Sequence, residues 1–178
     1  MQTDGGGWLV LLRSNEGSVN FRQSLKKHKV KMGDLLGEFW HGLTKMNRFT
    51  SSENQELRID LEDWEGNTAY AKYSHFSVSS TPRNFTLSVS GYSGTAGDAL
   101  SSANGMAFTT KDSDNDLNVN ENCAQLTKAG WWFKNCFQGL LTGQYSDTPE
   151  GGGIVWSPCK GFGYSLKSCE IKIRPTEE

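Results

Sequence analysis

The sequence predicts an α+β domain, and three features support this prediction. Apolar and polar residues alternate in several stretches, most clearly over residues 56–62, as is typical of strands with one face in solvent. Residues 24–31 and 38–49 have the composition and spacing of short helices. The 178 residues include 20 glycines, only four prolines and 11% aromatic residues. This composition indicates one tightly turned domain with a substantial core rather than a disordered chain.

The expected elements follow one another with short turns between them. Glycines 5–7 form a turn that leads into an apolar strand over 8–13, and Gly33 ends the basic helix predicted at 24–31. In the second helix, Phe39, Leu43, Met46 and Phe49 are close to helical spacing. A turn at 65–68 connects strands 56–62 and 69–76 in a hairpin, and further strands are expected at 85–89, 153–156 and 170–174.

Charge and motifs exclude several classes of function. The net charge of −2 provides no general basic field for nucleic acid, and no apolar run reaches the roughly 18 residues of a membrane span. No signal-peptide pattern opens the chain, so an export signal is expected to lie outside it. The acids Glu62, Asp63 and Glu65 lie on a polar strand face or beside a turn, which disfavours a glycosidase pair. Without a nucleophile beside a base, an open metal site or a cofactor motif, we expect no enzyme.

Cysteine usage indicates an oxidising compartment. The four cysteines are Cys123, Cys136, Cys159 and Cys169, with no CxxC pair, so zinc is disfavoured. Pairing in sequence order would close two short loops, although four cysteines allow three connectivities. Disulfides favour a secreted or cell-surface protein. The sequon Asn84-Phe85-Thr86 is consistent with export.

An acidic segment precedes Cys123. No basic residue lies between Lys111 and Lys128, and the segment is rich in carboxylates and asparagines, among them Asp112, Asp114, Asp116, Glu121, Asn115, Asn118 and Asn120. Calcium takes roughly six to eight oxygen ligands, and residues at alternate positions of an irregular loop can turn toward one centre. An EF-hand is excluded, because Leu117 replaces its glycine and Cys123 its final glutamate. The alternative is a surface turn whose Asp and Asn side chains cap their own backbone.

A series of motifs covers nearly the whole chain in a diagnostic order. They are GGGW (5–8), LGEFWHGL (36–43), LRIDLEDWEGNTAYAKY (57–73), TTKDSDND (109–116), NCAQ (122–125), GWWFKNC (130–136), LTGQY (141–145), GIVW (153–156) and EIKIRP (170–175). In this order they resemble the fibrinogen C-terminal domain family, which includes ficolins, tachylectins, angiopoietins and fibrinogen. The resemblance implies a twisted, mostly antiparallel sheet with short helices and long ordered loops that carry calcium and ligand sites. Residues 1–100 would form the central sheet region and 101–178 the calcium- and ligand-binding region.

The same resemblance implies that the chain lacks the small subdomain, with its own disulfide, that begins the family's domain. Calcium would be held by the carboxylates of Asp114 and Asp116 and by the carbonyls of Asn118 and Asn120. One additional residue before Cys123, compared with fibrinogen's gamma chain, makes Val119 or Glu121 an alternative for the last carbonyl. Cys159 and Cys169 are outside the family pattern and are interpreted as an extra bridge.

A ligand pocket is implied beside this calcium. It would be bounded by the Cys123–Cys136 disulfide and by a cis peptide between Asn135 and Cys136 that aims backbone N–H groups at a ligand oxygen. Seven residues map to it: Thr127, Asn135, Cys136, Phe137, Glu150, Gly151 and Phe162. Acetyl-binding members usually carry Tyr, His, Tyr, Ala and an aromatic residue at 127, 137, 150, 151 and 162. Phe137 and Phe162 therefore preserve an apolar funnel, with Trp132 and Tyr145 as further candidates, whereas Glu150 adds a negative charge.

The resemblance implies a secreted, calcium-dependent pattern-recognition lectin of innate immunity that binds acetylated or amino sugars on microbial surfaces. A segment upstream of this chain would assemble it into a homo-oligomer, because such single sites are weak and gain avidity together. The alternative is a protein-interaction module of the angiopoietin or fibrinogen type, in which calcium is purely structural. The acid at Glu150 favours an amino sugar or an amine-bearing peptide end over a neutral acetyl group.

Overall fold

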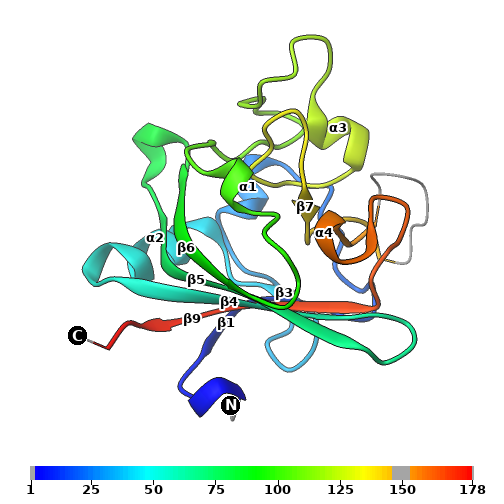
Figure 1. The fold of residues 1–178 in the computed structure, drawn as a ribbon. Helices are drawn as coiled ribbons and strands as arrows, with labels where there is room; N and C mark the ends of the chain where they lie inside the picture. The colour runs from blue at the N-terminus through cyan, green and yellow to red at the C-terminus, as the bar shows by residue number, and fades with distance from the viewer. Residues whose placement is uncertain (1–2, 146–152, 178) are drawn as a thin grey trace.

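The computed structural model describes residues 3–145 and 153–177 of the chain. Its main feature is a seven-stranded sheet in the order β2-β3-β1-β9-β4-β5-β6, in which neighbouring strands run antiparallel. The strands are β1 (Leu9–Ser14), β2 (Met32–Gly33), β3 (Phe39–Trp40), β4 (Gln55–Glu62), β5 (Thr68–Val78), β6 (Leu87–Gly94) and β9 (Ser168–Pro175). The predicted α+β class with a mostly antiparallel sheet is confirmed (Figure 1).

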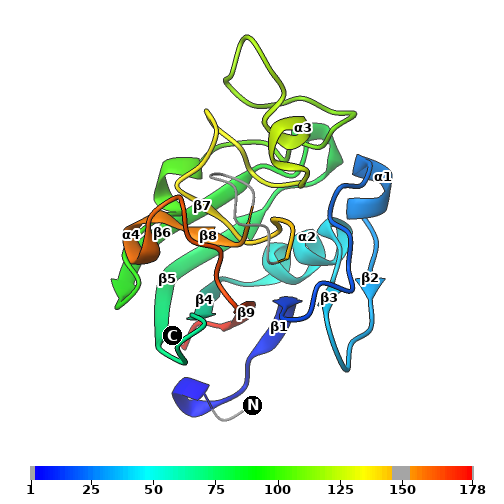
Figure 2. The same ribbon diagram turned by 90° about the vertical axis from the view of Figure 1, so that its right-hand side faces the viewer.

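Short helices and a second, two-stranded sheet complete the fold. The helices are α1 (Leu25–His28), α2 (Leu43–Ser52), α3 (Cys123–Thr127) and α4 (Ser157–Lys160), with 3-10 turns η1 (Thr3–Gly5), η2 (Thr81–Arg83) and η3 (Ser101–Ala103). The small sheet pairs β7 (Gly139–Leu140) with β8 (Val155–Trp156). The segment around α3 lies at one end of the molecule, and η1 lies at the other (Figure 2). Within the described ranges, no helix is long and apolar enough to cross a membrane.

Strand β4 follows the alternation that predicted it. Leu57, Ile59 and Leu61 are buried, whereas the charged residues between them are half-buried on the other face. Strand β9 pairs with β4 on one side and β1 on the other, so the last strand of the chain lies in the middle of the sheet. The alternating pattern therefore predicted the buried face, but the order of the strands depends on pairings across the whole chain.

The second predicted helix starts later than its apolar spacing indicates. Phe39 and Trp40 form β3 and pair with β1, and α2 begins only at Leu43. Gly42 separates them with a φ of 104°, and a Cβ there would lie 2.8 Å from the backbone of Lys29 and Val30. The close approach of the α1 segment thus requires glycine and prevents the helix from starting earlier.

An aromatic core joins the sheet to the loops above it. Trp40, Phe108, Trp131 and Trp132 are all buried, and the ring centroids of neighbouring members are 5.1–5.9 Å apart. Two of the three indoles also donate hydrogen bonds, Trp40 Nε1 to the His28 carbonyl and Trp132 Nε1 to the Phe85 carbonyl, both at 2.8 Å. These two bonds tie loop backbone to the core, whereas Trp131 Nε1 is buried without a partner among the described residues.

A buried carboxylate organises the loop between β1 and α1. Glu38 is only 1% exposed and accepts hydrogen bonds from the backbone N–H groups of Asn15, Gly17 and Val19 at 2.9, 3.1 and 2.6 Å. Burial alone would raise the pKa of Glu38, but these backbone donors outweigh it and hold the pKa below its ordinary value.

Replacing Glu38 by Gln is expected to lower the free energy of unfolding by about 2 kcal/mol at pH 7, because an amide cannot accept all of these bonds. The carboxylate's contribution is present above its ordinary pKa of 4.5 and is lost as the pH falls through the lower folded-state pKa. The difference between wild type and variant in urea unfolding should therefore shrink in acid. The exposed Glu53→Gln is the control, and a constant difference down to pH 3 would contradict the assignment.

Candidate calcium and ligand site

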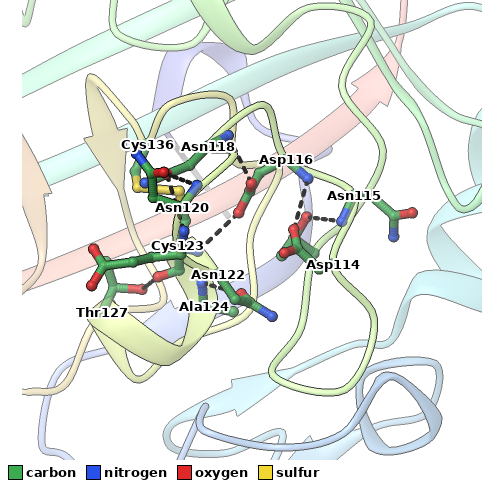
Figure 3. The surroundings of a disulfide bond; sticks show 12 residues. Asp114, Asn115, Asp116, Asn118, Asn120, Asn122, Cys123, Ala124, Thr127 and Cys136 are labelled. Carbon is green, nitrogen blue, oxygen red and sulfur yellow. Dashed lines mark hydrogen bonds between the residues drawn. A yellow bond between two sulfur atoms is a disulfide. The ribbon is translucent and has the colours of Figure 1, made fainter.

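The acidic loop is built from successive side-chain-to-backbone hydrogen bonds. Asp114 Oδ1 accepts from the N–H of Asp116 at 3.3 Å, Asp116 Oδ1 from Asn118 at 2.9 Å, and Asn118 Oδ1 from Asn120 at 3.0 Å (Figure 3). Short polar side chains form such turns readily, which is the arrangement expected of the surface-turn alternative. The same turns place the four predicted calcium ligands at alternate positions of one compact segment.

Two contacts hold this loop against the disulfide. The second oxygen of Asp116 accepts from the backbone N–H of Cys123, at the start of α3, at 2.8 Å. The N–H of Leu117 donates to the Lys134 carbonyl at 2.7 Å. Cys123 is bonded to Cys136, and the Asn135–Cys136 peptide bond is cis, as the resemblance implies. The loop, α3 and the turn at 134–138 therefore form one connected unit (Figure 3).

The donor set of this loop fits a hard cation. Burial raises the pKa of the Asp116 carboxyl, the N–H groups of Cys123 and Asn118 oppose the rise, and the neighbouring Asp114 carboxylate adds to it. A cation between the two carboxylates would relieve their repulsion. Among the described residues, no three His, Cys, Asp or Glu side chains converge on a metal position. The remaining ligands would have to be backbone or amide oxygens, which calcium accepts.

A shallow depression opens beside the loop. Its volume is about 350 Å³, and it is lined by Ser102, Leu117, Lys134, Asn135, Phe137 and Gln138. The Phe137 ring lies 5.9 Å from Phe162 and 6.3 Å from the buried Phe133, measured between centroids. Phe162 is 38% exposed, so this aromatic pair presents apolar surface to solvent beside a lysine.

The comparisons with known proteins identify the fold. The family model described as "Fibrinogen beta and gamma chains, C-terminal globular domain" matches residues 1–176. The chain belongs to the fibrinogen C-terminal domain family. Fibrinogen C domain-containing protein 1-A of Xenopus laevis is 46% identical to this fibrinogen C-terminal domain over 186 residues, covering 100% of the chain and 40% of the relative. Tenascin of Gallus gallus is 43% identical and covers 99% of the chain but 10% of the relative.

Solved structures agree with this assignment. The fibrinogen-like globe domain of human ANGPTL6 superposes with a TM-score of 0.96 at 36% identity, covering 99% of this chain and 82% of that one. Lamprey fibrin D-dimer, complexed with the peptide Gly-His-Arg-Pro-amide, gives 0.90 at 32% identity, covering 97% and 62%. The predicted family and fold are confirmed. The fibrinogen-related proteins are non-enzymatic, in agreement with the expectation that this domain is not an enzyme.

The structure of this fibrinogen C-terminal domain brings together some of the predicted ligand residues. The turn at 134–138 contains Asn135, Cys136 and Phe137, and Phe162 packs against the Phe137 ring. Thr127 is different, because it is buried in α3 and its hydroxyl donates to the Cys123 carbonyl at 2.8 Å. Glu150 and Gly151 lie outside the described residues.

The two further aromatic candidates lie outside the depression. Trp132 is buried, and Tyr145 packs against Trp64 and lines a separate cavity. Four of the six lining residues were not predicted from the sequence: Ser102, Leu117, Lys134 and Gln138. Leu117 is 56% exposed. An apolar residue within an acidic loop was the feature of the sequence that could have indicated a contact with a ligand.

The predicted bridge between Cys159 and Cys169 is wrong. Both are free thiols in this fibrinogen C-terminal domain. Cys169 faces the core from β9, where its Sγ contacts the Leu141 carbonyl at 3.6 Å, and burial raises the pKa of its thiol. Cys159 is instead part of α4 and lines a cavity of about 240 Å³ with Leu61 and Lys160. Cys169 therefore lies in the core and Cys159 beside a separate cavity, so an even number of cysteines did not imply a second disulfide.

Proposed function

We propose that this domain is a non-enzymatic, extracellular binding module that takes a protein or peptide segment at the turn formed by residues 134–138. The observation that supports this most directly is the depression lined by Phe137 and Lys134 in a disulfide-linked turn, with the Phe162 ring packed against Phe137. The similarity to lamprey fibrin D-dimer, whose structure contains a bound peptide, supports a peptide ligand. An extracellular location is supported by the Cys123–Cys136 bond.

The lining indicates the chemistry of the partner. An apolar side chain would pack on the Phe137–Phe162 pair, and Leu117 would extend this contact. Lys134 would attract a carboxylate of the partner, while the N–H groups of Cys136 and Phe137 are the donors that the family resemblance assigns to a ligand oxygen. A volume of about 350 Å³ suits one or two side chains rather than a long segment. We therefore propose a partner with an apolar residue next to an acidic group.

Parallel screens of a displayed peptide library and a glycan array test this function. The proposal expects peptide capture that weakens at least about tenfold in Phe137→Ala, as for a residue at the centre of an interface. Val119→Ala is the matched control, because Val119 is a 94% exposed apolar residue of the acidic loop and does not line the depression. An empty peptide screen, or equal loss in both variants, would contradict it.

A second candidate is the lectin predicted from the sequence, for acetylated or amino sugars on microbial surfaces. The Phe137–Phe162 pair favours it, because Phe137 is half-buried, Phe162 is exposed, and an acetyl methyl group would pack on these rings. A homo-oligomer formed through a segment outside this chain would then supply avidity. Glycan-array binding that depends on Phe137, together with an empty peptide screen, would establish this candidate.

We propose that Ca²⁺ is held by Asp114 and Asp116, with carbonyls of Asn118 and Asn120, and that it fixes the loop against the turn. Adding calcium at about a hundred times its Kd is expected to raise the free energy of unfolding by about 2.7 kcal/mol. Asp114→Asn should lose most of this gain in a thermal-shift titration. Glu121→Gln, an exposed acid of the same loop, should keep it. An unchanged wild-type melting temperature in millimolar calcium would contradict the proposal.

A further inference from the structure

We propose that Asn84 is a modification site that carries an N-linked oligosaccharide. Asn84-Phe85-Thr86 is the single Asn-X-Ser/Thr sequence among the 178 residues. The segment lies between η2 and β6, outside the acidic loop and the turn at 134–138. This inference rests on the proposed extracellular location, because the modification is made in the secretory pathway.

The backbone of Asn84 is fixed, but its side chain is free. Its N–H donates to the Thr81 carbonyl at 2.9 Å, and its carbonyl accepts from the N–H of Phe108 at 3.0 Å. Asn84 is exposed and has a φ of 53°, a left-handed conformation that asparagine tolerates well. Among the described residues, the Asn84 carboxamide has no hydrogen-bond partner. Its Nδ2 atom can therefore be substituted without breaking a contact of the fold.

The next two residues hold this corner in place. Phe85 is 2% exposed, and its carbonyl accepts from the Trp132 indole at 2.8 Å. Thr86 returns to the surface, where its hydroxyl donates to the Arg83 carbonyl at 2.6 Å. Side chains thus alternate outward, inward and outward along the sequon. A bulky hydrophilic group on Asn84 would extend into solvent while Phe85 remains in the core.

The transfer requires a polyprenyl-pyrophosphate-linked oligosaccharide as the donor. A bond forms between Nδ2 of Asn84 and the anomeric carbon of the first sugar, while the bond from that carbon to the pyrophosphate oxygen breaks. The amide loses one proton, and the lipid pyrophosphate leaves. The product is neutral at Asn84 and keeps one N–H, so the local charge is unchanged.

The test is secretion of the full chain from insect cells behind a cleavable leader, followed by peptide N-glycosidase digestion and peptide mass mapping. The expected result is a heavier secreted domain that the enzyme returns to its polypeptide mass while converting Asn84 to aspartate. Thr86→Ser keeps the sequon and should keep the added mass, whereas Thr86→Ala should lose it. Both variants should be secreted, because the hydrogen bond that Thr86→Ala loses, from the hydroxyl to the Arg83 carbonyl, lies at the surface.

A secreted wild type with the Cys123–Cys136 disulfide formed and an unmodified Asn84 would overturn this inference. Added mass that persists in Thr86→Ala would overturn it as well. Neither result would affect the proposed ligand site, because binding at that site is measured separately, by peptide capture with the same secreted samples. Loss of peptide capture in a glycosylated wild type would instead contradict the proposed function alone.

Discussion

Replacing Cys123 and Cys136 together by alanine is expected to lower the free energy of unfolding by about 3 kcal/mol. The bond joins residues 13 positions apart, and its loss releases the chain entropy that a closed loop of this length removes from the unfolded state. Alanine is the suitable replacement because Cys123 is fully buried, and a serine hydroxyl there would need a partner. Urea unfolding at pH 7 measures the change.

Cys159→Ala is the matched control, since it removes a part-exposed free thiol and should change stability by less than about 1 kcal/mol. The double variant should also weaken ligand capture, because α3 and the turn at 134–138 lose their covalent link. Equal stability of the double variant and wild type would show that hydrogen bonds such as Asp116 to Cys123 are sufficient to hold the loop.

Lowering the pH from 7 to 4 is expected to cost about 3 kcal/mol of stability through His28 alone. Burial lowers the pKa of His28 from 6.5 to about 4, against smaller opposing effects of the Phe21 carbonyl and Asp112. Its Nε2 lies 3.0 Å from that carbonyl and so must be the donor, which leaves Nδ1 as a buried lone pair without a partner among the described residues. A second proton would be added at Nδ1, on a buried ring that packs against Trp40 and Phe108.

The direction of this change in stability follows from the pKa values of His28 in the unfolded and the folded chain. The unfolded chain binds the proton below about pH 6.5, whereas the folded chain does so only near pH 4, so stability is complete above this window and falls as the pH decreases through it. His28→Gln should reduce the slope of unfolding free energy against pH, whatever its effect at pH 7. His75→Gln should retain the slope. A smaller slope will remain, because burial also lowers the pKa of His41.

The fold could be predicted well wherever the pattern of the sequence is local. Leu57, Ile59 and Leu61 alternate with charged residues, and the strand they predicted is present with that buried face. The helix predicted at 38–49 includes Phe39 because Phe39 and Leu43 are close to helical spacing. The pairing of Phe39 and Trp40 with β1 could not be predicted, since it depends on Arg13 and Leu12, which lie far away in the sequence.

The candidate site could likewise be predicted where the sequence pattern is local, but not where it depends on contacts between separate loops. Asp114, Asp116 and Cys123 were found from composition and family motifs, and the structure places them in one connected unit. Lys134 and Leu117 were missed because they meet only when the acidic loop closes on the turn through a backbone hydrogen bond. A hydrogen bond between backbone groups of two loops does not depend on the identity of their side chains, so it cannot be predicted from the sequence pattern.

The central place of β9 has a consequence for biosynthesis. Its residues Ile171 and Ile173 separate β1 from β4, yet β9 is synthesised after every other strand of this sheet. Until then the hairpin of β4 and β5 can form, but the nascent chain has no partner for the exposed edge of β4. We expect the sheet to close after synthesis of this segment is complete, so that a chain stalled before residue 168 is a substrate for chaperones rather than a partly native domain.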